Sequence, residues 1–384
     1  MGVTNRPTSS TGSADAVARV RLRSVRLPLP VPVSDAKVLS GRQRPMTEVA
    51  LLFAEVLTTD GAAGMGFSYS KRAGGDAQFA HAREIAPLLI GLDANDIQRS
   101  MLQLAWAGAS VGRSGIATQA IAAIDNALWD MKAKRSGLSL AKFIGSHHDA
   151  VRCYNTSGGF LHAPIGAVID NALAAVEGGI GGIKVKVGHP DGTQDLDRVR
   201  ALRDALGAHV PLMVDANQQW DRPTALRMGR ALEEFDLVWI EEPLDAYDVS
   251  GHAELARALD TPVATGEMLT SVREHRDFID AGAADIIQPD APRVGGTTQF
   301  LRLLALADEA GVGVAPHFAM ELHIHLAATH ASEPWVEHFD WLEPLFNETM
   351  EITNGRMLVP TAPGIGLTLS ERSDAWTVAD EVIR

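Results

Sequence analysis

The chain has 384 residues, of which 46% are hydrophobic and 5% aromatic, and its formal net charge is −14. This length exceeds one ordinary core and accommodates a barrel of about 250 residues together with a second domain. The negative charge argues against nucleic acid or an anionic membrane as a partner, and no apolar stretch reaches the length of a membrane span. A single cysteine, Cys153, excludes an internal disulfide and is typical of a reducing compartment. We therefore expect a cytoplasmic protein.

The N-terminal part of the chain reads as a tail followed by an α+β domain. Residues 1–15 are small and polar and lack the hydrophobic region of a secretory signal, so we expect a disordered tail. Strand-like patterns follow up to residue 57, and residues 77–147 read as helices. The clearest helix has Ile121, Ile124, Leu128 and Met131 at helical spacing. We predict that residues 16–150 form an α+β capping domain.

From residue 151 onward, short apolar runs alternate with amphipathic stretches. Eight such runs begin near Val151, Ile183, Leu212, Val238, Val263, Ile286, Val312 and Trp335. This alternation predicts an α/β domain, a TIM barrel of the (β/α)7β type, over residues 151–360, with no clear helical face after the last strand. An open doubly wound sheet is the competing architecture. The Pro/Gly-rich segment 361–384 is expected to return to the capping domain and complete it.

Three acidic residues follow consecutive predicted strands at a constant interval. Asp215, Glu241 and Glu267 are each separated by 26 residues, about the length of one βα unit. The spacing therefore predicts three carboxylates side by side at one strand end, which favours the closed barrel over the open sheet. Three hard oxygen ligands that leave positions for water and substrate suit Mg²⁺. The pattern predicts one Mg²⁺ site per chain.

Two lysines occupy alternate positions of the second predicted barrel strand. Lys184 and Lys186 point to the same side, because positions i and i+2 of a strand share a face. A solvated edge strand is the alternative, but a central barrel strand requires buried amines to have counter-charges. Lysines that lie close together beside a bound cation disfavour protonation, so we predict that one of them acts as a neutral base near neutral pH.

Three further polar residues follow the sixth, seventh and eighth predicted strands. Asp290 and His317 follow neighbouring strands, where the carboxylate can accept the imidazole N–H and orient the ring. His317 alone reads as a structural histidine, and the pair favours an acid/base dyad. Glu337 lies on the eighth strand, either in a surface ion pair or as a buried, protonated carboxyl that donates to a developing oxyanion.

This order of residues resembles the mandelate racemase subgroup of the enolase superfamily, and the likeness extends over nearly the whole chain. The resemblance implies that Asp215, Glu241 and Glu267 bind Mg²⁺ and that Lys186 and His317 are the two acid/base groups. It also implies that Asp290 supports His317 and that Glu337 stabilises an enolate, with Lys184 contributing to that stabilisation. Such a site removes the proton α to a carboxylate.

The predicted cap loops indicate the kind of substrate. The stretches VPVSDAKVLSGRQR and FSYSKRAGG are polar, and they provide Asp35, Lys37, Arg42, Lys71 and Arg72 as candidate ligands for hydroxyls and a second carboxylate. Asn217 faces the same side as Asp215 and is a further candidate ligand. These loops resemble those of the L-talarate/galactarate dehydratases of this subgroup. We therefore expect a small-molecule acid sugar as the partner, and a homo-oligomer.

Three alternatives remain open at this stage. One is a dehydratase of the same subgroup that acts on another acid sugar. A racemase or cycloisomerase acting on an apolar acid requires apolar residues in the cap loops. A catalytically silent binding protein requires the loss of site residues. None is missing from the set of seven formed by Lys184, Lys186, Asp215, Glu241, Glu267, Asp290 and His317.

Overall fold

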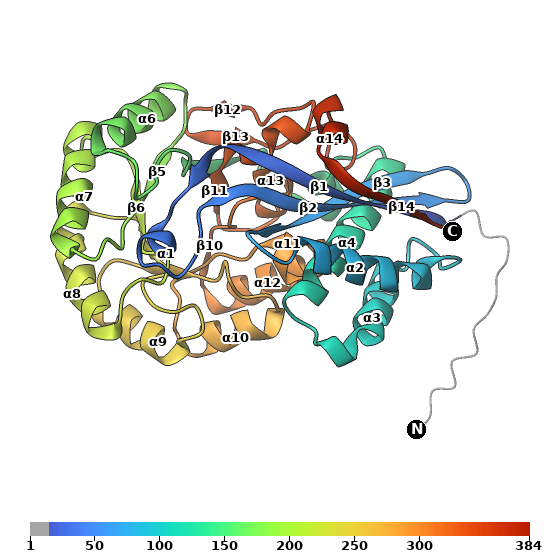
Figure 1. The fold of residues 1–384 in the computed structure, drawn as a ribbon, viewed down its shortest axis with the longest axis horizontal. Helices are drawn as coiled ribbons and strands as arrows, with labels where there is room; N and C mark the ends of the chain where they lie inside the picture. The colour runs from blue at the N-terminus through green and yellow to red at the C-terminus, as the bar shows by residue number, and fades with distance from the viewer. Residues whose placement is uncertain (1–14) are drawn as a thin grey trace.

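The computed structural model describes residues 15–384, so the predicted N-terminal tail lies, apart from Asp15, outside the described residues. Figure 1 shows a ring of strands and helices beside a second unit formed from the first third of the chain. The two units share one hydrophobic cluster, in which Phe53 and Phe67 of the first unit pack with Phe346 of the second. Neither unit is therefore a loosely tethered module.

The capping unit is an antiparallel sheet covered by helices. Its strands lie in the order β14-β1-β2-β3. Their bounds are Val17–Val33 for β1, Met46–Thr58 for β2, Ala63–Lys71 for β3 and Thr377–Ile383 for β14. Because β14 pairs with β1, the C-terminal segment completes this sheet, as predicted. The covering helices are α2 (Gly75–Ile85), α3 (Ile97–Ala107) and α4 (Ile116–Arg135).

The predicted barrel is confirmed. Its parallel strands are β4 (Ala150–Asn155), β5 (Gly182–Lys186), β6 (Leu212–Asp215), β7 (Ile240–Glu241), β8 (Val263–Thr265), β9 (Ile286–Ile287), β10 (Gly313–Val314) and β11 (Trp335–His338). The strands pair in chain order from β4 to β10, and β11 pairs with β4. Because the last strand lies beside the first, the sheet is not the open, doubly wound one.

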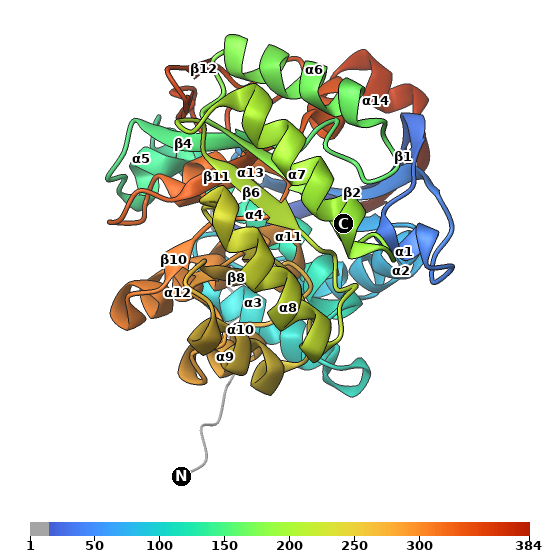
Figure 2. The same cartoon turned by 90° about the vertical axis from the view of Figure 1, so that its left-hand side faces the viewer.

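Helices follow the first seven barrel strands and form the outer layer, as Figure 2 shows for α6 to α9. Their bounds are Ile165–Glu177 for α6, Gly192–Leu206 for α7, Arg222–Leu232 for α8, Val249–Ala258 for α9, Val272–Asp280 for α10, Ala291–Val294 for α11, Thr297–Ala310 for α12 and Met320–Ala327 for α13. Between β11 and the next strand the chain forms a 3₁₀ helix, Asp340–Leu345. The missing helical face predicted for that stretch therefore corresponds to the absence of an α-helix between residues 339 and 351.

Smaller elements connect the two units. A short helix, α1 (Ala36–Leu39), lies beside the barrel in Figure 1, and α5 (Leu140–Ile144) leads into β4. The hairpin of β12 (Ile352–Thr353) and β13 (Arg356–Leu358) adds an antiparallel strand to β4, and α14 (Glu371–Ala375) precedes β14. Among residues 15–384 we find no helix with the length and apolarity needed to span a bilayer.

Buried polar side chains of α4 fix the capping unit on the barrel. Asp125 accepts hydrogen bonds from the backbone N–H and the hydroxyl of Thr298, at 2.8 and 2.5 Å. Asn126 accepts from the backbone N–H of Thr297 at 2.9 Å. These carbonyl and carboxylate oxygens satisfy N–H groups in the first turn of α12, which have no partner within the helix. The interface therefore has a defined register as well as apolar contacts.

Candidate active site

The three predicted metal ligands lie together at the carboxyl end of the barrel. Asp215 ends β6 and is in register with Glu241, which ends β7. Glu267 follows β8 after one glycine, Gly266, whose φ of 131° is accessible mainly to glycine. One carboxylate oxygen of each residue lies within 4.8 Å of the others, and all three side chains are buried. The equal spacing in the sequence thus corresponds to one cluster in space.

This cluster fits a small divalent cation. Mg²⁺ binds oxygen at about 2.0–2.1 Å, so two of its ligands lie at most about 4.2 Å apart. The separations in the cluster need only small side-chain movements to meet that limit. Burial and then the neighbouring Asp215 raise the pKa of Glu241 to about 8, although Lys184 opposes the shift. A group of buried carboxylates this close together is stable as anions only with positive charge beside it.

Two lysines supply part of that positive charge. Lys186 is in register with Asp215 and donates a hydrogen bond to it. Lys184 donates to both oxygens of Glu241, at 2.7 and 2.8 Å, and lies 2.9 Å from Glu337. The prediction that both amines point into the barrel is therefore confirmed by their positions.

The prediction that one lysine acts as a neutral base concerns the site with a cation bound, and it stays a prediction. Burial lowers the pKa of Lys186, but the charge of Asp215 raises it by more, and the net direction is upward. The same balance, with Glu241 and Glu337 as the counter-charges, raises the pKa of Lys184. In this structure the carboxylates next to the amines outweigh the repulsion between the two lysines, and a cation at the triad would take over that counter-charge.

Glu337 is an acceptor at both of its oxygens. The hydroxyl of Thr156 donates to Oε1 at 2.6 Å, and the backbone N–H of Phe318 donates to Oε2 at 2.6 Å. Burial opposes ionisation, but the charges of Lys184 and His317 outweigh it and lower the pKa of Glu337 to about 2. The expectation of a protonated carboxyl is therefore contradicted, because Lys184 lies against it. The alternative of a surface ion pair also fails, since the side chain is buried.

Asp290 and His317 form the predicted pair. His317 Nδ1 lies 2.8 Å from Asp290 Oδ2, and both side chains are buried. Because an ionised carboxylate can only accept, it fixes the imidazole proton on Nδ1 and leaves Nε2 facing the cavity. Nε2 lies 3.3 Å from an oxygen of Glu267. Burial lowers the pKa of His317, although Glu267 raises it.

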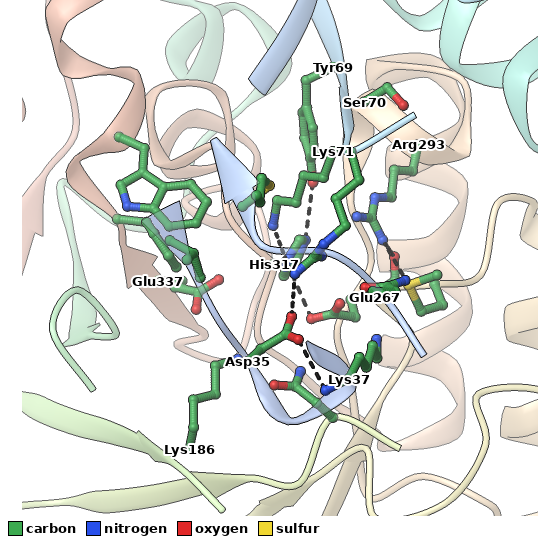
Figure 3. Close-up of a pocket in the computed structure, with 18 of the residues that line it drawn as sticks. Asp35, Lys37, Tyr69, Ser70, Lys71, Lys186, Glu267, Arg293, His317 and Glu337 are labelled. Carbon is green, nitrogen blue, oxygen red and sulfur yellow. Dashed lines mark hydrogen bonds and ion pairs between the residues drawn. The ribbon is translucent and has the colours of Figure 1, made fainter. Parts of the chain in front are cut away.

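The acid/base groups Lys186 and His317, with Glu267 of the triad, border one cavity of about 240 Å³ between the barrel and the capping unit. Figure 3 shows Tyr69 and Lys71 extending from β3 toward His317, with Lys186 on the barrel side and Glu337 to one flank. The cavity also contacts Lys37, Asp35, Arg72, Asn217 and Glu267. Four of the five candidate ligands predicted from the cap loops therefore lie around it, and Arg42 does not line it.

These cap-loop residues are not equally free to bind a ligand. Arg72 donates to a carboxylate oxygen of Asp35 at 2.8 Å and to the carbonyl of Arg44 at 3.1 Å. Asp35 also accepts from two backbone N–H groups of α1, so it holds the loop that carries it. Asn217 donates to Asp215 from its backbone and from its side-chain amide. These three residues support neighbouring groups, and Lys71 is the cap-loop cation nearest the acid/base pair.

Lys71 lies directly on the open side of His317. Its Nζ is 3.3 Å from His317 Nε2 and 4.2 Å from the centre of the Phe318 ring. Burial, followed by the charge of Arg293, lowers the pKa of Lys71 to about 8. A buried ammonium over an aromatic face with no carboxylate in direct contact is suited to an incoming anion.

Two groups of residues that line this cavity were not predicted from the sequence. Phe160, Phe339 and Trp341 form an apolar wall of the cavity, so the pocket is less polar than its cap loops indicated. Tyr69 and Arg293 also line the cavity. The alternation S-Y-S-K in β3, which places Tyr69 on the same face as Lys71, was the available signal for Tyr69.

Strained backbone conformations are concentrated at the same strand ends. Asn217, Gln218 and Glu242, which follow β6 and β7, have φ values of 45°, 64° and 40°. Phe318 and Ala319, which follow His317, have φ values of 58° and 24°. Positive φ is uncommon for such residues and persists where the surrounding structure enforces it, often at functional sites. Here it turns the chain sharply after each functional side chain.

Comparison with known proteins identifies relatives over the whole chain. A family model described as mandelate racemase / muconate lactonizing enzyme, N-terminal domain, matches residues 30–145. A second, described as enolase C-terminal domain-like, matches residues 167–373. The two matches divide the chain between the capping unit and the barrel.

Individual relatives are similar over nearly their full lengths. L-talarate/galactarate dehydratase of Salmonella typhimurium is 60% identical over 97% of this chain and 93% of its own. A 3,6-anhydro-alpha-L-galactonate cycloisomerase of Streptomyces coelicolor is 35% identical over 92% of this chain and 97% of its own. The crystal structure of an L-talarate dehydratase from Polaromonas sp. JS666, complexed with Mg and L-glucarate, matches with a TM-score of 0.94 and 66% identity, covering 96% of this chain and 99% of the other.

Proposed function

The chain belongs to the mandelate racemase subgroup of the enolase superfamily, and on that premise we propose that it is a magnesium-dependent acid sugar dehydratase acting on galactarate or L-talarate. The observation that carries the proposal is the placement of two acid/base groups on either side of the triad: Lys186 against Asp215 and His317 against Glu267. A substrate held over the triad would present opposite faces of its α-carbon to them.

Asp215, Glu241 and Glu267 would hold the Mg²⁺ ion. When bound, the ion neutralises the substrate carboxylate as negative charge builds on it and takes over the counter-charge that Lys186 provides to Asp215. Lys184 and Glu337 would then remain paired beside the same oxygens, with Thr156 and the Phe318 N–H fixing Glu337. This network keeps Lys184 charged and aimed at the reacting carboxylate.

Lys186 would remove the α-proton, so the electrons of the C–H bond pass into the carboxylate as an enediolate. His317, protonated on both ring nitrogens, would donate the Nε2 proton to the β-hydroxyl, and that group leaves as water while the α,β double bond forms. The resulting enol becomes the 2-keto-3-deoxy acid. Asp290 would hold the imidazolium throughout by accepting from Nδ1. Return of a proton to the opposite face of the α-carbon gives some epimerisation.

Lys71 would select for a second carboxylate. It borders the cavity from the capping unit, and its ammonium lies over the aromatic face of Phe318. Lys37 borders the same cavity and would add to the positive potential there. The ion pair of Asp35 with Arg72 would shape the wall that contacts the hydroxyls.

The alternative activities have less support. The apolar wall of Phe160, Phe339 and Trp341 is a feature that a racemase of an apolar acid would use. Against this, the similarity to the dehydratase, at 60% identity, greatly exceeds that to the cycloisomerase, at 35%. A silent binding protein would not need a buried triad with two acid/base groups beside it.

The test is turnover of a panel of acids by the purified chain after chelation and again after addition of Mg²⁺. We expect galactarate or L-talarate to release a 2-keto product only with the metal. Galactonate should release it more slowly, and mandelate, which has no β-hydroxyl to eliminate, should release none. Absence of any metal-dependent keto product from a sugar acid would refute the proposal. Racemisation of mandelate as the faster reaction would favour the racemase.

We further propose that the chain acts in the cytoplasm as a homo-oligomer. The single, buried Cys153 supports a reducing compartment. Exposed apolar side chains on and beside α3, Leu102 and Trp106 among them, support self-association. Light scattering of the purified protein would measure the oligomeric state directly.

A further inference from the structure

The end of strand β3 in the capping unit contacts His317 on both sides. Tyr69 and Lys71 alternate along the strand and therefore share one face. The Tyr69 oxygen lies 3.3 Å from Nδ1 of His317, and Lys71 Nζ lies 3.3 Å from Nε2. Both residues border the cavity, but the Tyr69 side chain is fully buried and its hydroxyl lies on the Nδ1 side of the ring, opposite the Lys71 ammonium. The two residues must therefore have different roles.

Tyr69 and His317 share a single acceptor. The Tyr69 hydroxyl donates a hydrogen bond to Asp290 Oδ2, the same oxygen that accepts from His317 Nδ1 at 2.8 Å. The other oxygen, Oδ1, accepts from the backbone N–H of Arg293 at 3.2 Å. Donors on both oxygens prevent the carboxylate from rotating about its terminal bond. The orientation of the imidazole is thereby set by three groups.

The Tyr69 ring is itself held in place. It packs edge-on against Phe318, with ring centres 4.8 Å apart. The guanidinium carbon of Arg293 lies 5.5 Å from the centre of the Tyr69 ring. Arg293 also donates to the backbone carbonyl of Glu267 at 2.5 Å. Burial raises the pKa of Tyr69 far above its usual range, so the hydroxyl remains a donor. A buried donor with a fixed ring has one position available to it.

We propose that Tyr69 is a positioning residue of the acid/base site, which completes the Asp290–His317 pair from the capping unit and aligns Nε2 for proton donation to the leaving hydroxyl. This role rests on the proposed dehydratase function. It means that the capping unit contributes to the chemistry as well as to substrate selection. The dyad is fully ordered only when β3 is seated on the barrel.

The test is Tyr69→Phe, with Tyr154→Phe as the matched control. Both changes remove one buried hydroxyl and keep the ring, but the Tyr154 hydroxyl has no hydrogen-bond partner within residues 15–384. Loss of a group that orients a functional side chain from behind typically reduces activity about 10- to 100-fold. We expect that loss in kcat of Y69F, with KM changed less than about threefold, and wild-type kinetics for Y154F. Equal kinetics for Y69F and wild type would overturn the proposal.

A second comparison separates positioning from general loosening of the cap. Exchange of the substrate α-proton with deuterated solvent through Lys186 does not need His317. In a His317→Asn background, adding Y69F should therefore leave the residual exchange rate unchanged. A further loss of exchange equal to that seen for dehydration would show that Tyr69 acts through the overall structure, and would refute a positioning role.

A spectroscopic measurement tests the contact without turnover and with Tyr69 retained. The chain has three tyrosines, so Y154F with Tyr247→Phe leaves Tyr69 as the only site for fluorotyrosine. We expect the fluorine resonance to shift on Asp290→Asn, which replaces a carboxylate acceptor, and to stay in place for Asp277→Asn on α10. An unresponsive resonance would refute the role of Tyr69. Failure of the wild type to dehydrate any acid sugar, with a responsive resonance, would instead refute the proposed function.

Discussion

The two acid/base groups of the site are supported in different ways. Lys186 lies on β5, in register with Asp215 on β6, which is in turn in register with Glu241 on β7. Every charged partner on that side comes from a neighbouring barrel strand. His317 instead contacts Asp290 at the adjacent strand end. Its other two contacts come from the capping unit: Tyr69, which precedes Asp290 by 221 residues, and Lys71 of the same strand.

This difference shows what a barrel can and cannot provide alone. Parallel strands in register align side chains at their carboxyl ends without help from distant segments. A ring that must hold one orientation and change protonation state needs contacts from several directions, and the capping unit provides the direction that the barrel leaves open. Changes on the Lys186 side should therefore act through charge, and changes on the His317 side through alignment and substrate choice.

The largest effect is expected from a substitution in the carboxylate triad, on the Lys186 side of the site. Replacing Glu241 by Gln removes one charge from the triad, so we expect weak Mg²⁺ binding and a loss in kcat/KM of at least about 10³-fold, equivalent to about 4 kcal/mol. Titration calorimetry with Mg²⁺ and steady-state kinetics provide the measurements. Glu242→Gln is the matched control, since this neighbour is equally buried but lies outside the triad. Wild-type turnover by E241Q with metal bound would refute the assignment.

Replacing His317 by Asn tests the cap-supported side. Without an acid to protonate the departing hydroxyl, dehydration should fall about 10²- to 10⁴-fold, the usual range for general acid catalysis. Exchange of the α-proton should persist through Lys186, and proton NMR in deuterated buffer would follow it. His323→Asn serves as a control, because His323 accepts from the backbone N–H of Ala291, away from the cavity. Near-normal dehydration by H317N would show that the roles are wrongly assigned.

The same contrast explains how much could be predicted from the sequence. The barrel and its triad were predictable, because a repeat of fixed length places Asp215, Glu241 and Glu267 on consecutive strands. The positions of Lys184 and Lys186 followed from the two-residue period of a strand. The cap-supported contacts were not predictable in this way, because no periodicity links Tyr69 to Asp290.

The protonation states were beyond the sequence for a related reason. A pKa depends on burial and on charges within a few ångströms, and these distances come only from the fold. The sequence places Lys186 near Lys184, but it does not show whether the charge of Asp215 raises the pKa of Lys186 by more than the charge of Lys184 lowers it. A neutral Glu337 was expected for the same reason, because the sequence does not show that the Lys184 amine lies 2.9 Å from the Glu337 carboxylate.

A smaller effect should sharpen the role of the cap in substrate choice. The wild type should prefer galactarate over galactonate by about 30- to 1000-fold in kcat/KM, on the scale of a buried charged hydrogen bond of about 2 to 4 kcal/mol. Lys71→Met should reduce this preference by at least about tenfold and affect galactonate less. Because burial lowers the pKa of Lys71 to about 8, the wild-type preference should also decline above pH 8, as the ammonium loses its charge.

The control for this comparison is Lys142→Met, an exposed lysine paired with Asp149 far from the cavity. Its preference should equal that of the wild type at every pH. If K71M has the same selectivity as the wild type, another cation binds the distal carboxylate, and Lys37 is the first to test.

The smallest expected effect concerns stability on the His317 side. Glu321, on α13, is buried, and neither of its carboxyl oxygens has a hydrogen-bond partner in the described part of the chain. Burial, followed by repulsion from Glu343 and Asp340, raises its pKa to about 8, from 4.5. Between these two values the folded state keeps a proton that the unfolded state releases. The free energy of unfolding should therefore fall as pH rises from about 4.5 to 8.

Glu321→Gln removes this dependence, since the amide stays neutral at every pH. The stability of E321Q relative to wild type should increase by up to about 1.4 kcal/mol per pH unit, or about 2 to 3 kcal/mol between pH 5 and 7. Urea unfolding at a series of pH values provides the measurement, and Glu309→Gln, at an exposed position of α12, provides the control. A constant difference between E321Q and wild type over this range would mean that Glu321 is ionised in the folded protein. In that case a positively charged group would have to lie beside the Glu321 carboxylate, and no side chain of residues 15–384 forms such a pair in this structure.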